Sequence, residues 1–239
     1  VYSDIGELRK DLVRFDATTV PAALGLAFLN YLLRFVRWHR YLRILGIPLG
    51  MADSFAIFLA GLVMSVTPGK AGELLKSYLV RIRIGTPVTR SAPVVLAERL
   101  TDVISLIVLS LLGVMSFQFG VLPLIAGGLA TAILLLVLGN RRVAAFVVRL
   151  VGRVPLAGRF ADPLARAYEG IRLLVAPFHL LWAGALGAAA WFAECLAFHL
   201  VLLGFGVDLG VVTVTFIYSF ATLFGAITMM PGGVGPTEG

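Results

Sequence analysis

Three ionisable residues lie within five positions of one another in an otherwise apolar stretch of the sequence. Glu98, Arg99 and Asp102 belong to the run 91–117. Residues three or four positions apart share one face of a helix, so both carboxylates and the guanidinium can point the same way. We interpret them as a buried acid–base cluster, either a structural set of ion pairs or, as we prefer, a set that also lines a path for a polar substrate.

Two proline–glycine breaks carry further polar residues. They are 67–73 (TPGKAGE) and 230–238 (MPGGVGPTE). Proline ends one half-helix, glycine lets the backbone come close, and the N–H groups that begin the next helix attract anions such as phosphate. We expect Lys70, with Lys76 or Arg81, to neutralise a phosphate. Glu73 then supplies a counter-charge or a proton relay, and Glu238 is its counterpart.

Glu194 is a further acidic residue inside an apolar run, 178–205, and no basic residue is near it in sequence. Such a side chain is either protonated or paired across helices. His199 is five residues further on, about 140° around a helix, which disfavours a direct pair or a metal site. We interpret Glu194 as a proton-coupling or head-group residue and His199 as an interior histidine.

The composition indicates the setting in which these residues act. The 239 residues are 59% hydrophobic and 14% charged, with a mean hydropathy of +0.97, whereas soluble proteins are about 45–50% apolar and about 25% charged. Several runs approach the roughly 17 to 25 residues of a membrane-spanning helix, and the alternation typical of a barrel is absent. The net charge is +7, and the lysines and arginines that produce it lie at the ends of apolar runs. This placement favours membrane phosphates over nucleic acid as partners.

The apolar runs predict an all-α, polytopic helical membrane protein. We interpret Arg34, Arg37, Arg40 and Arg43 as anchors that orient the first helix, and the arginine-rich stretch after residue 140 as an interfacial helix or helix pair on anionic lipid. Residues 1–239 form a single transmembrane domain, which we interpret as a fragment of a longer chain. The expected elements are 20–33 with a basic extension to 43, the short run 54–66, 91–117, 121–138, the amphipathic stretch 140–176, 178–205 and 211–230.

The run 54–66 is too short to cross a bilayer, and the charges around it favour re-entry. A full crossing places the arginines of 34–43 and the basic residues of 70–90 on opposite faces, which the positive-inside rule disfavours. A segment that dips in and returns keeps all basic clusters on the cytoplasmic side. Non-helical backbone at membrane depth needs protein or a watery cavity around it, so a re-entrant break indicates a site.

An internal repeat is the second organising feature. Residues 54–56 and 219–221 both read SFA, and each leads through apolar residues into a proline–glycine break. We predict an inverted repeat with two broken, re-entrant helices: a first half 20–117, a link 118–177 and a truncated second half 178–239. Paired breaks of this kind indicate a transporter's midplane site. The candidate substrate-binding residues are Pro68, Lys70, Gly72, Glu73, Lys76, Arg81, Glu98, Arg99, Asp102, Glu194, Pro231, Gly232, Gly233, Gly235 and Glu238.

At these motifs the sequence resembles the transmembrane-region family of lysylphosphatidylglycerol synthase, also called flippase-like membrane proteins. The family usually has arginine where Lys70 stands, and lysine offers a point charge in place of a fork. The resemblance implies a multi-pass inner-membrane protein associated with moving lipids or lipid-linked glycans between leaflets. It rests on Pro68-x-Lys70-x-Gly72-Glu73-x-x-Lys76, Glu98-Arg99-x-x-Asp102, Pro231-Gly232-Gly233-x-Gly235-x-x-Glu238 and Arg34-x-x-Arg37-Trp38.

Three functions remain open at this stage. The preferred one is a flippase-like transporter for an anionic phospholipid or lipid-linked sugar, such as a polyprenyl phosphate. The alternatives are an intramembrane transferase acting on a lipid phosphate and a secondary transporter for small anions. The sequence has no G-x-S-x-G, H-E-x-x-H or aspartate-rich metal motif, so we expect no enzyme, no catalytic residue, no cofactor and no metal. Nucleic acid is not an expected partner, and a homo-oligomer is compatible with the sequence.

Overall fold

The structure is a computed structural model that describes residues 14–64, 73–113 and 161–227, with isolated positions between 125 and 140. All regular elements in these ranges are helices, which confirms the helical class. The expected helix 121–138 and both proline–glycine breaks lie largely or wholly outside the described residues. The elements are η1 (Ala17–Thr19), α2 (Val20–Ile44), α3 (Met51–Val63), α4 (Leu74–Ile84), α5 (Val88–Gly113), α8 (Ala161–Leu174), α9 (Pro177–Gly204) and α10 (Val211–Ile227).

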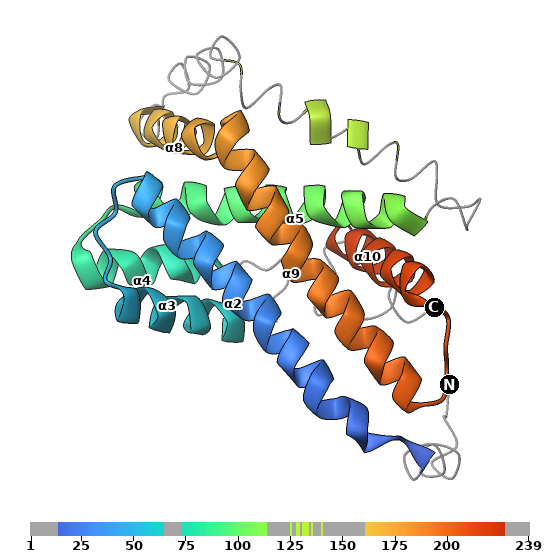
Figure 1. Cartoon of the computed structure of the whole chain (residues 1–239). Helices are drawn as coiled ribbons and strands as arrows, with labels where there is room; N and C mark the ends of the chain where they lie inside the picture. The colour runs from blue at the N-terminus through green and yellow to red at the C-terminus, as the bar shows by residue number, and fades with distance from the viewer. Residues whose placement is uncertain are drawn as a thin grey trace, which may run out of the picture.

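Helices α2 and α9 form a long antiparallel pair that runs diagonally through the molecule (Figure 1). The amide of Asp16, just before η1, donates to the carbonyl of Gly204 over 2.8 Å. At the other end, the rings of Tyr41 and Trp182 lie 5.3 Å apart. Residues 17–44 and 177–204 are both long and apolar enough to cross a membrane, judged by length and composition. We call the end where α2 stops and α9 starts the basic end, because arginines such as Arg43 are exposed there.

Helices α3 and α4 run antiparallel beside each other (Figure 1). An ion pair of 2.9 Å between Asp53 and Arg83 joins the start of α3 to the end of α4. Towards the other end of the pair, Gly61 of α3 lies against the side chain of Lys76. The 13 residues of α3 extend only about 20 Å, against about 30 Å for the hydrocarbon layer. The predicted short helix is therefore confirmed, and the start of α3 and the end of α4 both lie at the basic end.

Helix α5 connects the two ends of the molecule. Near its start, Arg90 donates to the carbonyls of Leu45 and Gly46 at the basic end, over 3.2 and 3.3 Å. Near its end, the hydroxyls of Ser110 and Ser219 are 2.8 Å apart, which joins α5 to α10. Helix α8 packs on the first half of α5, because Gly170 allows close contact with Pro93.

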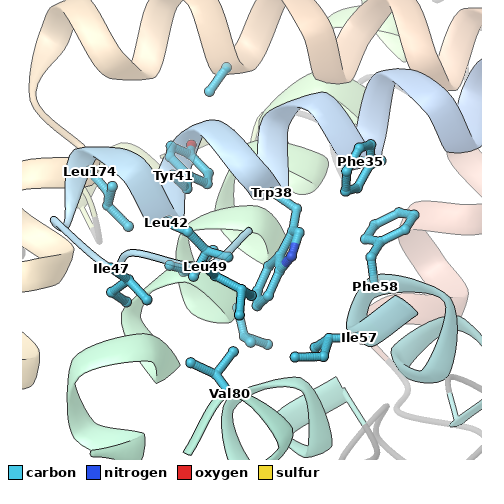
Figure 2. Packing of buried hydrophobic residues seen from close by; sticks show 14 residues of the cluster. Phe35, Trp38, Tyr41, Leu42, Ile47, Leu49, Ile57, Phe58, Val80 and Leu174 are labelled. Atoms are coloured by element: carbon cyan, nitrogen blue, oxygen red, sulfur yellow. The ribbon is translucent and has the colours of Figure 1, made fainter. Parts of the chain in front are cut away.

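The largest buried core lies where the second half of α2 meets α3, α4 and α5. Trp38, Tyr41 and Leu42 of α2 are fully buried there. Figure 2 shows Phe58 and Val80 from the α3–α4 pair beside them. Large side chains on one face of α2 therefore fix the short α3–α4 pair against the longer helices.

The turn from α2 to α3 recurs between α9 and α10. In the first, the amides of Gly46 and Ile47 donate to the carbonyls of Arg43 and Leu42 over 3.0 and 2.9 Å. In the second, Gly206 and Val207 donate to Leu203 and Leu202 over 2.8 and 2.9 Å. Gly46 and Gly206 both have positive φ angles, of 64° and 77°, which glycine adopts without strain. The sequences are LGIPLG at 45–50 and FGVDLG at 205–210.

These matching turns change the register expected from the SFA words. The turns make Met51 and Val211, the first residues of α3 and α10, equivalent. Ser54 then matches Val214, five residues before Ser219. A short apolar word recurs easily in this composition, whereas a turn with a left-handed glycine constrains the chain. Helix α3 starts at the basic end, and α10 starts at the opposite end, where Val212 lies against Gly113 at the end of α5.

Candidate functional site

Three guanidinium groups converge on the carboxylate of Asp102, in the second half of α5. Arg37 donates through Nη2 to Oδ1 over 2.6 Å. On the other oxygen, Oδ2, Nη2 of Arg99 lies at 3.0 Å and Nη2 of Arg34 at 3.6 Å. Arg37 is 1% exposed, although it stands inside an apolar helix. Charged groups at such depth persist only when they are paired, and Asp102 supplies that pairing.

Two further ion pairs join α4 to α5. Nζ of Lys76 donates to Oε2 of Glu98 over 2.6 Å, and both side chains are buried. The same ammonium lies 4.4 Å from the centre of the Trp38 ring, a cation–π contact. Nε of Arg99 lies 3.0 Å from Oε2 of Glu73, so Arg99 bridges two carboxylates. We call this set the ionic network: Arg34, Arg37, Glu73, Lys76, Glu98, Arg99 and Asp102.

Two glycines make room for the network. A β-carbon on Gly187 of α9 would lie 2.5 Å from Oγ of Ser105 and 2.7 Å from Nη1 of Arg37. A β-carbon on Gly61 of α3 would overlap the Cγ of Lys76. The backbone of α9 therefore covers Arg37, and the backbone of α3 covers Lys76, at distances that only glycine permits.

Counted over the described residues, the ionic network carries one surplus positive charge. It contains four cations and three carboxylates. Within the network, only Arg37 and Lys76 donate well-aligned hydrogen bonds. Asp102 Oδ2, Glu73 Oε2 and Arg99 Nε lie at ion-pair distance from their partners but make no aligned hydrogen bond. The loosely held guanidiniums are also the accessible ones, since the side chains of Arg99 and Arg34 are 28% and 14% exposed. Arginine forks match phosphate and carboxylate oxygens, so this arrangement can hold an anion.

A second polar group of residues surrounds Glu194 of α9. Nδ2 of Asn30, on α2, donates to its Oε2 over 2.9 Å. The hydroxyl of Tyr218, on α10, donates to its Oε1 over 3.0 Å. The same Asn30 nitrogen donates to the carbonyl of Ala190 over 2.8 Å. We call Asn30, Glu194 and Tyr218 the Glu194 cluster; no ion pair involves Glu194 within the described ranges.

The structure brings together five of the predicted site residues in the ionic network. Glu98, Arg99 and Asp102 share the inward side of α5, as their spacing predicts. Lys76 is held by Glu98, and Arg81 is exposed near the end of α4, apart from the network. Glu194 bonds across helices, one of the two predicted states, but in the other cluster. Outside the described residues lie Pro68, Lys70, Gly72, Pro231, Gly232, Gly233, Gly235 and Glu238.

Sequence reasoning missed four residues of the two clusters: Arg34, Arg37, Asn30 and Tyr218. The interpretation of Arg34 and Arg37 as orientation anchors is wrong, since both face Asp102. Arg43 is exposed at the basic end, as an anchor would be. A usable signal was the helical spacing of Arg37 with two large aromatic residues, Trp38 and Tyr41, which places all three on a buried face one turn after Arg34.

The described residues offer no arrangement of three or more His, Cys, Asp or Glu side chains that could hold a metal ion. His199 is buried on α9, and its Nδ1 makes no hydrogen bond. The single cysteine, Cys195, is also buried.

Comparison with known proteins places this geometry in a family. The family model described as lysylphosphatidylglycerol synthase TM region matches residues 1–239. A UPF0104 membrane protein from Methanothermobacter thermautotrophicus is 23% identical over 260 residues, which cover 98% of this chain and 77% of that relative. No solved structure matches the chain. Three of the motifs that carry the resemblance lie in or beside the ionic network, and the family model matches the chain from end to end. The chain therefore belongs to the family of lysylphosphatidylglycerol synthase transmembrane regions and is a membrane protein.

Proposed function

We propose that the protein is a flippase-like transporter and not an enzyme, and that it moves a phosphate-bearing lipid or lipid-linked glycan between leaflets. The observation that carries the proposal is the surplus positive charge of the ionic network, held at Arg34 and Arg99 among apolar helices. An unneutralised cation at membrane depth is costly, so it favours an anionic ligand that supplies the missing charge. The phosphate binds at this network while the acyl or prenyl chains stay in lipid.

The arrangement of the short helices supports transport. Helix α3 starts at the basic end, and helix α4 ends there. The positive-inside rule assigns this end to the cytoplasm. Helix α10 starts at the opposite end, after a turn with the same hydrogen bonds as the one before α3. We infer a re-entrant α3–α4 pair and an inverted counterpart that begins with α10. Interrupted helices at matching positions of two halves surround the substrate sites of many transporters.

The family description supports a lipid substrate. It names a synthase of lysylphosphatidylglycerol, a lipid with a phosphodiester. The relative from Methanothermobacter thermautotrophicus is named only as a membrane protein. We propose an anionic phospholipid or a polyprenyl-phosphate-linked sugar as the substrate, in the plasma (inner) membrane, because both present the charge that the ionic network lacks.

Transport by the purified protein in liposomes tests the proposal. Fluorescent phospholipids and polyprenyl phosphates are placed in one leaflet, and their appearance in the other is followed by quenching with dithionite. We expect wild-type protein to move at least one lipid of the panel, and Arg34→Gln and Arg99→Gln to slow it at least tenfold. The matched control is Arg43→Gln, an exposed arginine of the same helix, which should leave the rate unchanged.

Two outcomes of this assay contradict the proposal. The first is lipid movement no faster than in protein-free vesicles across the whole panel. The second is a flux of soluble phosphate without any lipid movement, which supports the small-anion transporter instead. If Arg43→Gln loses as much transport rate as Arg34→Gln, the rate does not depend specifically on the ionic network. That result contradicts the assigned site.

The topology has its own test, because replacing Cys195 by alanine leaves a cysteine-free background. Single cysteines at Asp53, Arg83 and Asp208 are then probed in sealed vesicles with an impermeant maleimide. All three positions are exposed or partly exposed. We expect 53 and 83 to react from one face and 208 from the other. Reaction of 53 and 83 from different faces contradicts the re-entrant pair.

A further inference from the structure

The Glu194 cluster has no part in holding an anionic head group. Its central residue is a carboxyl group, which repels a phosphate unless it is protonated. It lies between α2, α9 and α10, whereas the carboxylates of the ionic network lie on or beside α4 and α5. Asn30, the α2 member of the cluster, is 1% exposed. A partly buried acid between three helices, without a cation in ion-pair contact among the described residues, needs a role of its own.

We propose that Glu194 is the binding site for one proton whose uptake and release accompany lipid movement. This inference rests on the proposed transport and names its energy coupling. Asn30 and Tyr218 are the positioning residues of the site. The ligand is a proton alone, and no other co-reactant is required.

The donors around Glu194 suit both of its protonation states. When the carboxylate is ionised, Nδ2 of Asn30 and the hydroxyl of Tyr218 donate to its two oxygens, over 2.9 and 3.0 Å. When Oε1 carries the proton, the Tyr218 hydroxyl rotates and accepts, since a phenol can donate or accept. Asn30 continues to donate to Oε2. No hydrogen bond is lost between the two states, and no heavy atom has to move.

Other titratable groups near the cluster do not replace Glu194 in this role. From α2, Tyr31 faces Tyr218, and from α9, Cys195 lies beside Glu194. Phenols and thiols ordinarily lose their protons well above neutral pH. His199 of α9 is buried about one turn further along the helix, and the described structure gives its Nδ1 no hydrogen-bond partner. It is therefore the one competing proton carrier that an experiment has to remove.

Arg34 links the Glu194 cluster to the ionic network. It stands one helical turn after Asn30 on α2, and its guanidinium lies 5.5 Å from the ring centre of Trp191, one turn before Glu194. A proton on Glu194 removes a negative charge one helical turn along α9 from Trp191, the residue against which Arg34 lies. The positive potential at Arg34 then rises, and a phosphate binds there more tightly. Proton and lipid phosphate therefore favour each other's binding, as linkage requires.

Liposomes with an imposed pH gradient test the coupling. Wild type, Glu194→Gln and His199→Gln are compared, with Glu169→Gln as the control, since Glu169 is an exposed carboxylate of α8. For one coupled proton, a gradient of about one pH unit shifts the leaflet ratio of the lipid up to about tenfold. We expect that shift in wild type, His199→Gln and Glu169→Gln. In Glu194→Gln we expect lipid exchange that the gradient does not bias.

A second measurement keeps the inference separate from the transport assay. Infrared difference spectra of the purified protein between a low and a high pH report carboxyl protonation directly. We expect a carboxylic-acid band in wild type that is absent in Glu194→Gln and shifted in Tyr218→Phe. Tyr218→Phe keeps the carboxyl group and removes the partner hydroxyl, so it serves if Glu194→Gln does not fold.

The outcomes separate the two proposals. Lipid movement in wild type that ignores the gradient, or a gradient response in Glu194→Gln equal to that of wild type, overturns the proton site and leaves the transporter. Loss of the response in His199→Gln alone assigns the proton to His199 and also overturns it. If no lipid moves, the proposed transport fails, and the infrared band then decides whether Glu194 binds a proton.

Discussion

The ionic network and the Glu194 cluster begin one turn apart on the same helix, yet they neutralise their acids in opposite ways. Asp102 is surrounded by three guanidiniums, of which Arg37 is locked by a 2.6 Å hydrogen bond. Among the described residues, Glu194 is held only by an amide and a phenol. Fixed cations hold a carboxylate in its ionised state, whereas neutral donors accept either state. The same helix α2 thus supports one site of fixed charge and one site of variable charge.

The matching turns relate these two regions to each other. The spacing that makes Gly46 equivalent to Gly206 also makes Arg34 equivalent to Glu194. Asn30 and Ala190 are equivalent by the same spacing of 160 residues, and they touch through a 2.8 Å hydrogen bond where α2 and α9 cross. By this spacing, residues of opposite charge stand at corresponding positions of α2 and α9.

The largest expected effect comes from Asp102→Asn. The change leaves Arg34, Arg37 and Arg99 without the carboxylate that they share, and removing one partner of a buried pair costs about 3–5 kcal/mol. We expect an apparent melting temperature in detergent lower by about 10 °C or more, for a domain of this size. Fluorescence-detected size-exclusion chromatography after heating measures it.

Glu194→Gln is the matched change in the other cluster. The donors around Glu194 are neutral, so the substitution leaves no unpaired charge behind. We therefore expect the melting temperature to fall several times less than in Asp102→Asn. Equal shifts for the two variants mean that Glu194 is held by fixed charge after all. That result removes the contrast between the regions.

The next effect in size concerns the glycine that covers the ionic network. Gly187→Ala forces a β-carbon against Ser105 and Arg37, both of which are fixed by other bonds. Overpacking of this kind costs about 1–3 kcal/mol. Gly184→Ala, one turn earlier on α9, meets nothing within 4 Å and is the control. Melting temperatures of the two variants are compared, and a Gly184→Ala protein that melts as low as Gly187→Ala contradicts the packing argument.

Much of the fold follows from the sequence because hydrophobic runs fix where helices lie. The runs 178–205 and 54–66 correspond closely to α9 and α3, and the short length of α3 was already evident. The spacing of Arg99 and Asp102 predicted their pairing, because i and i+3 side chains meet on any helix. Local rules of this kind need no knowledge of which helices are neighbours.

The side-chain partners that lie on different helices could not be predicted from the sequence in the same way. Arg37 looks like an anchor because a run of arginines near a helix end usually faces lipid head groups. Only the packing of α2 against α5 shows that it faces Asp102. Asn30 and Tyr218 are ordinary in sequence and gain a role through Glu194, 164 and 24 residues away. The Glu98–Asp102 segment carries two carboxylates and one guanidinium, and its net negative charge was the clue that at least one cation had to come from elsewhere.

A smaller effect is expected for Tyr218→Phe. The variant removes one hydrogen bond to Glu194 and no charge, which costs about 1 kcal/mol and lowers the melting temperature by about 2–4 °C. Tyr31→Phe is the control, because Tyr31 is 46% exposed on α2. Calorimetry of the protein in nanodiscs measures both. A loss in Tyr218→Phe as large as that of Asp102→Asn places this hydrogen bond on a par with the fixed charges and contradicts the proposed difference.

The smallest effect belongs to a third carboxylate, Asp16, which is exposed before η1. The hydroxyl and amide of Thr18 donate to it over 2.7 and 3.0 Å, and these bonds lower its pKa. Because the pKa is lower in the folded state, the stabilisation is present above the unfolded value of about 3.9 and is lost as the pH falls through the folded value.

Asp16→Asn isolates this contribution, since asparagine caps a helix about as well as aspartate but does not titrate. We expect the variant to match wild type at pH 7 and to lose slightly less stability than wild type between pH 5 and pH 3. The measurement is the difference between the two melting curves at each pH, which cancels every other titrating group. Solvent screens an exposed carboxylate, so its effect stays below that of Tyr218→Phe. An equal or larger effect would mean that burial is not what separates Asp16 from the two clusters inside the helices.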